Sequence, residues 1–151
     1  MKIRIEIDEK IIEEEIVIKC NVLSSQVKNI QSTLTDLLSQ KTQINFYKKD
    51  QEYYIAMEDI LFFESDSQGI SAHTADNMYQ VKHKLYELEK VLPRTFIRIS
   101  KSSIVNTDHI YSILRNIASA SKVEFRNTNK KLYVSRHYYK QLKLRLTEMR
   151  R

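Results

Sequence analysis

Residues 96–106 have the sequence FIRISKSSIVN, in which two apolar segments flank a polar one. The polar segment is Ser100-Lys101-Ser102-Ser103, and short apolar segments around such a segment are typical of paired β-strands. Hydroxyl and ammonium groups in a turn suit contacts to phosphates and base edges, whereas a plain surface turn has the same composition. The stretch therefore predicts two strands joined by a turn, and it leaves both interpretations of the turn open.

Short strand-like segments continue on both sides of this stretch. Upstream, we predict strands at residues 44–47, 53–57, 60–64, 70–74 and 78–82. Downstream, we predict strands at residues 110–114, 123–126 and 132–134. Two helices are predicted in the same region, a short one that Pro93 ends and a longer one over residues 136–149 with Ser135 as its N-cap. Many short strands with few helices indicate an α+β fold that is mainly β.

The first forty residues follow other patterns. Apolar and charged residues alternate over residues 3–7, and a similar alternation over residues 16–20 predicts a second strand. Apolar residues then recur at steps of three and four between residues 23 and 37, which predicts an amphipathic helix capped by Ser24 or Asn21. Its apolar stripe spans about two heptads, which favours packing on its own sheet over a coiled-coil seam, since a seam needs three or more.

The composition changes near residues 40–43, after this helix. We therefore predict two regions, a small strand–strand–helix extension over residues 1–42 and one domain over residues 43–151. We expect the extension to function in dimerisation or regulation.

The composition excludes several classes of protein. A single cysteine, Cys20, rules out an internal disulfide framework and a multi-cysteine zinc site. A single glycine, Gly69, cannot build a phosphate-binding loop, and the four histidines are scattered without a metal-binding spacing. The first ten residues lack the apolar core of a signal peptide, and the longest apolar runs are too short to cross a bilayer. We expect a cytoplasmic protein that is not an enzyme and needs no cofactor or metal.

The charge is distributed unevenly along the chain. Residues 94–151 carry 14 Lys and Arg and three acidic residues, a net charge of +11, whereas residues 1–93 carry a net charge of −5. Separation of this size favours a polyanionic partner for the C-terminal part, although a solvated basic face has the same composition.

Arg136 stands in the first turn of the predicted last helix. A cation there opposes the helix dipole, while the free N–H groups of the same turn favour a phosphate. An arginine that extends to nucleic acid, where it can bond guanine in a bidentate way, explains this placement, and an ordinary surface arginine is the alternative. The apolar residues of this helix favour docking on the sheet over insertion into a groove, and no preceding helix completes a helix-turn-helix.

Several of these segments together resemble the LytTR DNA-binding domains. The resemblance rests on residues 96–106 followed by Asp108-His109-Ile110, on Ile60-Leu61-Phe62-Phe63-Glu64 before a polar loop, on Leu92-Pro93 after a short helix, and on Val134-Ser135-Arg136 before the last one. The match covers residues 43–149, about 70% of the chain.

The resemblance implies an elongated, mainly antiparallel β fold that contacts DNA through loops around residues 66–69, 100–103 and 135–137. Lys101 and Arg136 match base-contacting positions of the family, and Ser67-Gln68 matches a third contact region. The candidate DNA-binding residues are Ser67, Gln68, Ser100, Lys101, Ser102, Arg136 and His137. The family often has His and Arg where this chain has Ser100 and Lys101, and a lysine supplies a point charge instead of a bidentate fork. Base preference is therefore expected to differ.

The resemblance also implies partners. The expected function is that of a stand-alone, sequence-specific transcriptional regulator without a receiver domain, which binds double-stranded DNA as a homodimer. By analogy with similar regulators, a small membrane protein that inhibits it is a further expected partner. The alternative is a protein-interaction module that has kept the fold and lost DNA binding.

Overall fold

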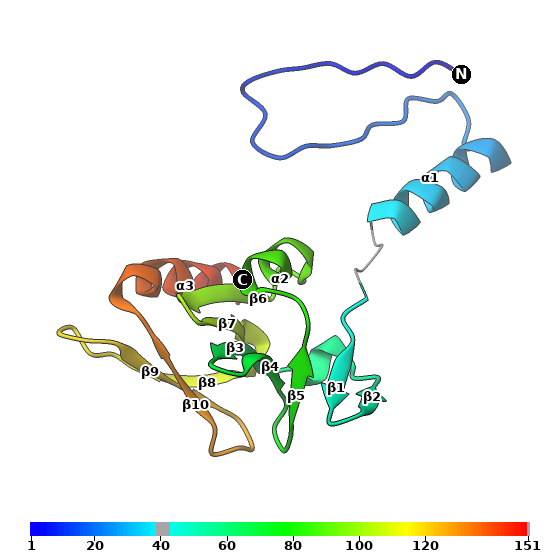
Figure 1. Ribbon diagram of the computed structural model, residues 1–151. Coiled ribbons are helices and arrows are strands. Elements are labelled where there is room, and N and C mark those ends of the chain that lie inside the picture. The colour runs from blue at the N-terminus through cyan, green and yellow to red at the C-terminus, as the bar shows by residue number, and fades with distance from the viewer. Residues whose placement is uncertain (39–42, 151) are drawn as a thin grey trace. The chain divides into compact units, whose positions relative to one another are not determined.

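In the computed structural model, residues 1–38 and 43–150 are described (Figure 1). The chain divides into two compact units between Gln40 and Lys41, and each unit is considered by itself. The predicted boundary between residues 42 and 43 adjoins residues 39–42, which lie outside the described part.

The N-terminal unit contains one helix, α1, at Ser25–Leu38. The Ser24 hydroxyl accepts a hydrogen bond from the Val27 backbone N–H at 3.3 Å, so Ser24 caps the helix. Val27 is buried, and Ile30 and Leu34 on the same face are half-buried. The predicted amphipathic helix and one of its two predicted caps are confirmed.

The two strands predicted within residues 1–20 are wrong. Residues 1–24 contain no strand, and Figure 1 shows this segment running out and back. The side chains of Ile3 and Ile7 are 93% and 92% exposed, so the alternating isoleucines cover no core within the described residues of the N-terminal unit. The physical reason is that an isolated pair of strands is only marginally stable in water when no third strand or helix covers its apolar face.

The second unit is mainly antiparallel β, as predicted. Its strands are β1 (Phe46–Lys48), β2 (Gln51–Tyr53), β3 (Phe62–Asp66), β4 (Gly69–His73), β5 (Met78–Val81), β6 (Phe96–Ser100), β7 (Ser103–Asn106), β8 (Ile110–Leu114), β9 (Ser121–Phe125) and β10 (Lys131–Val134). Its helices are α2 (Leu85–Val91) and α3 (Arg136–Met149), with short 3₁₀ turns at Met57–Asp59 and Thr107–His109. The bounds of β8 and α3 equal the predicted ones.

The strands form two sheets, and all the paired neighbours are antiparallel. The larger sheet has the order β2-β1-β5-β4-β3-β7-β6, and the smaller has the order β10-β9-β8. In Figure 1, α3 lies along β6, which agrees with the contacts between these two elements. The apolar face of α3 therefore docks on the sheet, as the sequence favoured, with Leu142 fully buried.

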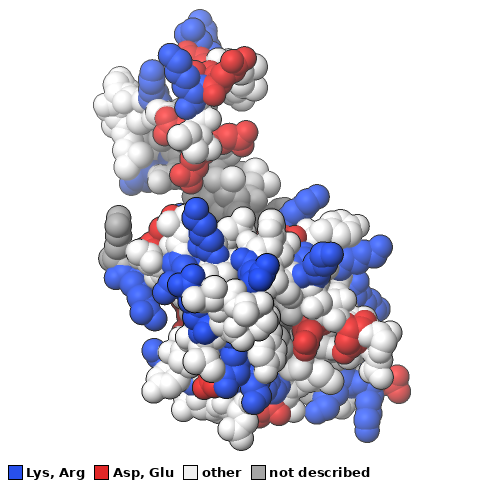
Figure 2. Space-filling view, turned by 90° about the vertical axis from the view of Figure 1, so that its left-hand side faces the viewer, with Lys and Arg blue, Asp and Glu red and all other residues white. Residues whose placement is uncertain are grey.

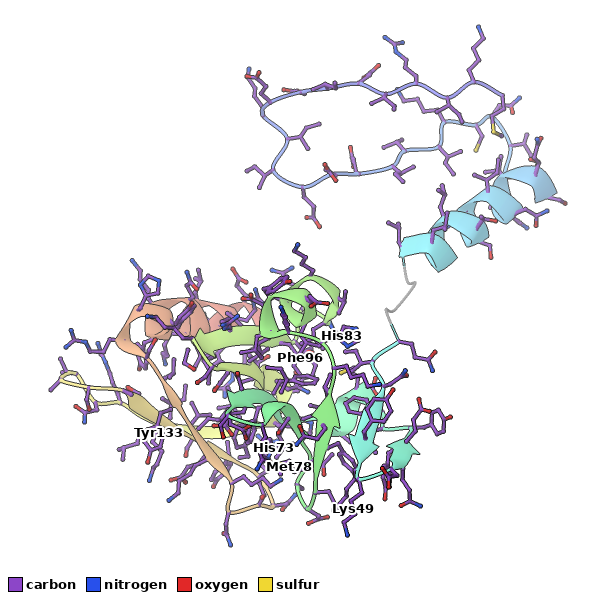
Figure 3. All side chains as sticks on the ribbon, in the orientation of Figure 1. Lys49, His73, Met78, His83, Phe96 and Tyr133 are labelled. Atoms are coloured by element: carbon purple, nitrogen blue, oxygen red, sulfur yellow. The ribbon has the colours of Figure 1, made fainter. Side chains whose placement is uncertain are left out.

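The central strands of the larger sheet are buried on both faces. On β3, Phe63 belongs to one core, together with Leu88 of α2 and Phe96 (labelled in Figure 3), while the adjacent Phe62 belongs to a second core. The second core lies between these strands, the smaller sheet and α3, and Leu142 is part of it. Burial on both faces explains why residues 60–63 form a continuous apolar run instead of an alternating one.

Asn106 fixes the end of β7 and the turn that follows. Its side-chain amide donates to the Ile60 carbonyl at 2.9 Å, and its amide oxygen accepts from the Asp108 backbone N–H at 3.2 Å. Asn106 is 2% exposed. The Asn106–Asp108 part of the sequence motif is thus structural, because it ties β7 to the start of β3 and caps the 3₁₀ turn.

The turn between β9 and β10 docks on the turn between β4 and β5. The Thr128 hydroxyl donates to the Ala75 carbonyl at 3.0 Å, and the Lys130 ammonium donates to the Asn77 carbonyl at 2.7 Å. Beside them lies His73, which is labelled in Figure 3. Its ring stacks on Phe62 with 4.2 Å between the ring centroids. These contacts join the two sheets at the end of β4 that lies opposite Gly69.

Candidate nucleic-acid interface

The turn between β3 and β4 carries two of the predicted site residues. Asp66 pairs with Gly69 across the hairpin, so Ser67 and Gln68 form a two-residue turn, and both are exposed. The Gln68 backbone N–H donates to the Asp66 carboxylate at 2.7 Å. Gly69 has φ of +119°, which L-residues with a side chain rarely adopt, so the glycine closes this turn.

The turn between β6 and β7 carries three more predicted residues. The Ser102 backbone N–H donates to the Ser100 hydroxyl at 3.2 Å, so Ser100 shapes the turn. Lys101 and Ser102 are exposed, and in the described part of the chain the Lys101 ammonium has no hydrogen bond or ion pair. A free cation at the tip of a hydrogen-bonded turn is available to an anion.

The strand register brings these two turns together. β3 and β7 are antiparallel neighbours with Glu64 opposite Ser103, so the end of β3 lies at the start of β7. A backbone hydrogen bond of 2.8 Å from the Ser65 N–H to the Ser102 carbonyl joins the two turns directly.

The start of α3 lies at the same end of the domain. The Ser135 N–H donates to the Ile99 carbonyl at 2.9 Å, which places residues 135–137 beside Ser100. All the predicted site residues therefore lie on turns at one end of the unit, which is at the left in Figure 1. We call residues 66–69, 100–103 and 135–137 the three-turn surface.

Ser135 occupies the N-cap position of α3, as predicted, but its hydroxyl makes no capping hydrogen bond. The Tyr138 N–H bonds the Ser135 carbonyl at 3.1 Å, whereas the Ser135 hydroxyl satisfies neither the Arg136 nor the His137 N–H, so these two groups remain suited to an external anion. Arg136 and His137 in this turn are exposed. The Arg136 guanidinium donates to the Ala118 carbonyl at 3.3 Å.

The contact to Ala118 identifies a neighbour that the sequence did not indicate. The loop between β8 and β9 reaches the three-turn surface, and the Arg115 guanidinium in it lies 5.1 Å from the centroid of the Tyr139 ring on α3. Only the register of β8 and β9 places this loop here, and no motif in the sequence marks it.

The electrostatics of this end favour an anionic partner. Figure 2 faces it and shows more Lys and Arg than Asp and Glu over the surface of the second unit. In the described ranges, no three His, Cys, Asp or Glu side chains are grouped as metal ligands would be. No helix in those ranges is long and apolar enough to cross a membrane.

Comparisons with known proteins agree with this geometry. The family model of the LytTr DNA-binding domain matches residues 50–147. This chain belongs to the LytTR family. The resemblance predicted from the motifs is confirmed, and the family is one of DNA-binding domains and not a class of enzymes.

Relatives and a solved structure extend the LytTR assignment. An uncharacterised HTH-type transcriptional regulator of Staphylococcus aureus strain MSSA476 is 32% identical over 97% of this chain and 99% of its own length. A similarly named protein of strain NCTC 8325 / PS 47 is 31% identical over the same shares. The LytTr DNA-binding domain of a putative methyl-accepting/DNA response regulator from Bacillus cereus has a TM-score of 0.63 and 22% identity over 70% of this chain and 97% of that chain. This last likeness confirms the predicted fold.

The names of the Staphylococcus relatives refer to a helix-turn-helix. In the described part of this LytTR chain, no two helices are joined by a short turn, because α2 ends at Val91 and α3 begins at Arg136.

Proposed function

We propose that this chain regulates transcription by binding specific sequences of double-stranded DNA through the three-turn surface. The observation that carries the proposal is the convergence of three turns with exposed residues at one end of the second unit. Two backbone hydrogen bonds, of 2.8 Å from Ser65 to Ser102 and of 2.9 Å from Ser135 to Ile99, hold the turns beside one another. A surface fixed in this way is pre-organised for a partner of defined shape.

The residues of this surface fall into two roles. The Lys101 ammonium and the Arg136 guanidinium are long, exposed donors, which suit the acceptor atoms of guanine in the major groove. The hydroxyl groups of Ser67 and Ser102, and the free N–H groups at the start of α3, suit phosphate oxygens. Lysines and arginines elsewhere on the basic C-terminal part would supply most of the sequence-independent affinity.

Selection of bound sequences from a random DNA pool, followed by titration of the selected site, tests the proposal. Lys101→Ala and Arg136→Ala are each expected to weaken binding to that site by about 1–3 kcal/mol and to relax the base preference. Lys48→Ala is the matched control, because Lys48 is an exposed lysine that bonds Asn77 at the opposite end of the sheet. It should leave the base preference unchanged.

Two results would contradict the proposal. Binding that is indifferent to salt would exclude phosphate contacts, since each contact adds about 0.9 to the dependence of log K on log salt. If the chain selects no DNA but captures a protein that the Lys101→Ala/Arg136→Ala double variant also captures, it is an interaction module with this fold.

We also propose that two copies bind one operator and that residues 1–38 hold the copies together or bind a regulator such as a small membrane protein. The support is the exposure of Ile3, Ile5 and Ile7, which leaves an apolar segment without a core of its own. The selected DNA should then contain two short repeats one or two helical turns apart. Light scattering and titration of a chain that begins at residue 43 test the role of the extension. An unchanged oligomeric state together with an unchanged DNA affinity would contradict the proposed role of the extension.

A further inference from the structure

Arg98 on β6 is bonded to the turn that carries Lys101. Its Nε donates to the Ser100 carbonyl at 2.6 Å, and its Nη2 donates to the Lys101 carbonyl. Its Nη1 donates to the Glu89 carboxylate of α2 at 3.1 Å. One planar guanidinium thus holds two carbonyls of the turn and one carboxylate at the same time, which the single ammonium of a lysine cannot reproduce.

Regular backbone pairing alone does not fix this turn. The register between β6 and β7 shifts between Arg98 and Ser100, so the ladder is interrupted just before the turn. The Ile99 carbonyl in the interrupted segment bonds Ser135 of α3. The carbonyls of Ser100 and Lys101 accept hydrogen bonds from the Arg98 side chain. These bonds hold the turn where the backbone hydrogen bonds between β6 and β7 are interrupted.

We propose that Arg98 is a positioning residue, which Glu89 orients and which holds the β6–β7 turn so that the Lys101 side chain is presented to DNA. The proposal rests on the proposed function of the three-turn surface. Lys101 is exposed at the tip of the turn, whereas the Arg98 side chain is only 19% exposed. Lys101 therefore contacts the DNA, and Arg98 acts on binding only by positioning Lys101.

A direct phosphate contact by Arg98 is the competing role. The positions of its nitrogens argue against it, because all three already donate to protein acceptors and the Glu89 carboxylate balances the charge. The two roles differ in salt dependence. Loss of a phosphate contact lowers the dependence of log K on log salt by about 0.9, whereas loss of a positioning residue leaves it unchanged.

Titrations of the full chain with the selected site and with unrelated DNA, each at several salt concentrations, test the proposal. Arg98→Gln is expected to weaken binding to the selected site about tenfold, with the salt dependence and the affinity for unrelated DNA unchanged. Arg98→Lys should not restore binding, since a compact ammonium on a flexible stem cannot span the three separate acceptors that the planar guanidinium fork reaches. Glu89→Gln removes the carboxylate but leaves Arg98 its two carbonyl acceptors in the turn. It should therefore also weaken binding to the selected site, by a smaller factor than Arg98→Gln.

Arg94→Gln is the matched control. Arg94 and Arg98 both line a cavity of about 530 Å³ between α2, β6 and α3. The Arg94 side chain, however, is 78% exposed and pairs with Glu148 at 3.3 Å, away from the turn. Arg94→Gln should keep the ratio of its affinities for the selected site and for unrelated DNA, whereas Arg98→Gln should lower that ratio about tenfold. A weaker salt dependence in Arg98→Gln with equal losses on both DNAs, or unaltered binding in Arg98→Gln and Glu89→Gln, would overturn the positioning role.

Amide hydrogen exchange of the free protein separates this inference from the proposed function. In Arg98→Gln, the Ser102 N–H should exchange faster than in the unaltered chain, while the amides of β3 keep their protection. If the unaltered chain binds no DNA, the proposed function fails, and this measurement still decides whether Arg98 fixes the turn. Unchanged exchange at Ser102 would then overturn the inference by itself.

Discussion

His73 makes the stability of the second unit depend on pH. Its imidazole is stacked on Phe62, and its Nδ1 lies 3.3 Å from the Lys130 ammonium. Burial and the Lys130 charge lower the pKa of His73 from 6.5 to about 4, although Asp66 acts in the opposite direction. The Glu64 carboxylate lies 3.7 Å from Nε2, but its side chain is 42% exposed and its attraction does not outweigh these causes.

The sign and size of the effect follow from the lowered pKa. The unfolded chain binds a proton at His73 below pH 6.5, whereas the folded chain binds it only near pH 4. The stabilisation is therefore complete above pH 6.5 and is lost as the pH falls toward 4. Between pH 7 and pH 5 the free energy of unfolding should fall by about 2 kcal/mol through this residue, at 1.36 kcal/mol for each pH unit below 6.5.

Urea denaturation followed by circular dichroism, at pH 7 and at pH 5, measures this loss. His73→Phe keeps a ring on Phe62 and removes the titrating group, so its loss should be about 2 kcal/mol smaller than that of the unaltered chain. Burial and the Asp66 charge raise the pKa of Glu64, so this carboxyl makes the free energy of unfolding rise as the pH falls. Both proteins contain Glu64, and comparing them at each pH removes its contribution. Equal losses, or a His73 that titrates near pH 6.5 in NMR spectra, would refute the reasoning.

Two further predictions concern the packing that supports the site. Leu142→Ala should lower the free energy of unfolding by about 2–5 kcal/mol, because Leu142 is 0% exposed. Leu144, which is 61% exposed on the same helix, is the control, and Leu144→Ala should change the free energy of unfolding by less than about 0.5 kcal/mol in the same denaturation assay. Asn106→Ala should destabilise by about 2–3 kcal/mol, since it removes the buried bonds of 2.9 Å and 3.2 Å to the Ile60 carbonyl and the Asp108 N–H. Asn129→Ala, at an exposed turn, is its control, and equal losses in the two asparagine variants would contradict this account.

Most elements of the second unit were predictable because polar turns separate its apolar runs, but the strand predicted at residues 53–57 is wrong, since β2 lies at Gln51–Tyr53. Ser135 before an amphipathic segment placed the start of α3, and the bounds of that helix matched. The alternation of residues 3–7 failed as a strand signal for a physical reason. Alternation tells which side chains would share a face, but a strand also needs a partner backbone, and residues 1–38 offer none with an apolar cover.

The convergence of the site could not be derived from the spacing of its residues. Ser67, Lys101 and Arg136 are far apart in the sequence, and only the register of β3 against β7 and the bond from Ser135 to Ile99 bring their turns to one end. Arg98 was missed for a related reason. An arginine within an apolar run indicates a half-buried strand, but the sequence does not show that its side chain turns back to the two carbonyls after it.

The three-turn surface is continuous with the second core, so packing in that core bears on the geometry of the proposed DNA site. Ile99 is 0% exposed and packs in the same core as Leu142, while its carbonyl holds Ser135 at the start of α3. A change in this core can therefore shift Arg136 relative to Lys101 without touching either residue. The exposed side chains of Lys101 and Arg136 have no such packing role, so replacing them is expected to have little effect on stability. Lys101 fits this division, because the hydrogen bonds of the turn use its backbone carbonyl and the Ser100 hydroxyl, and not its ammonium.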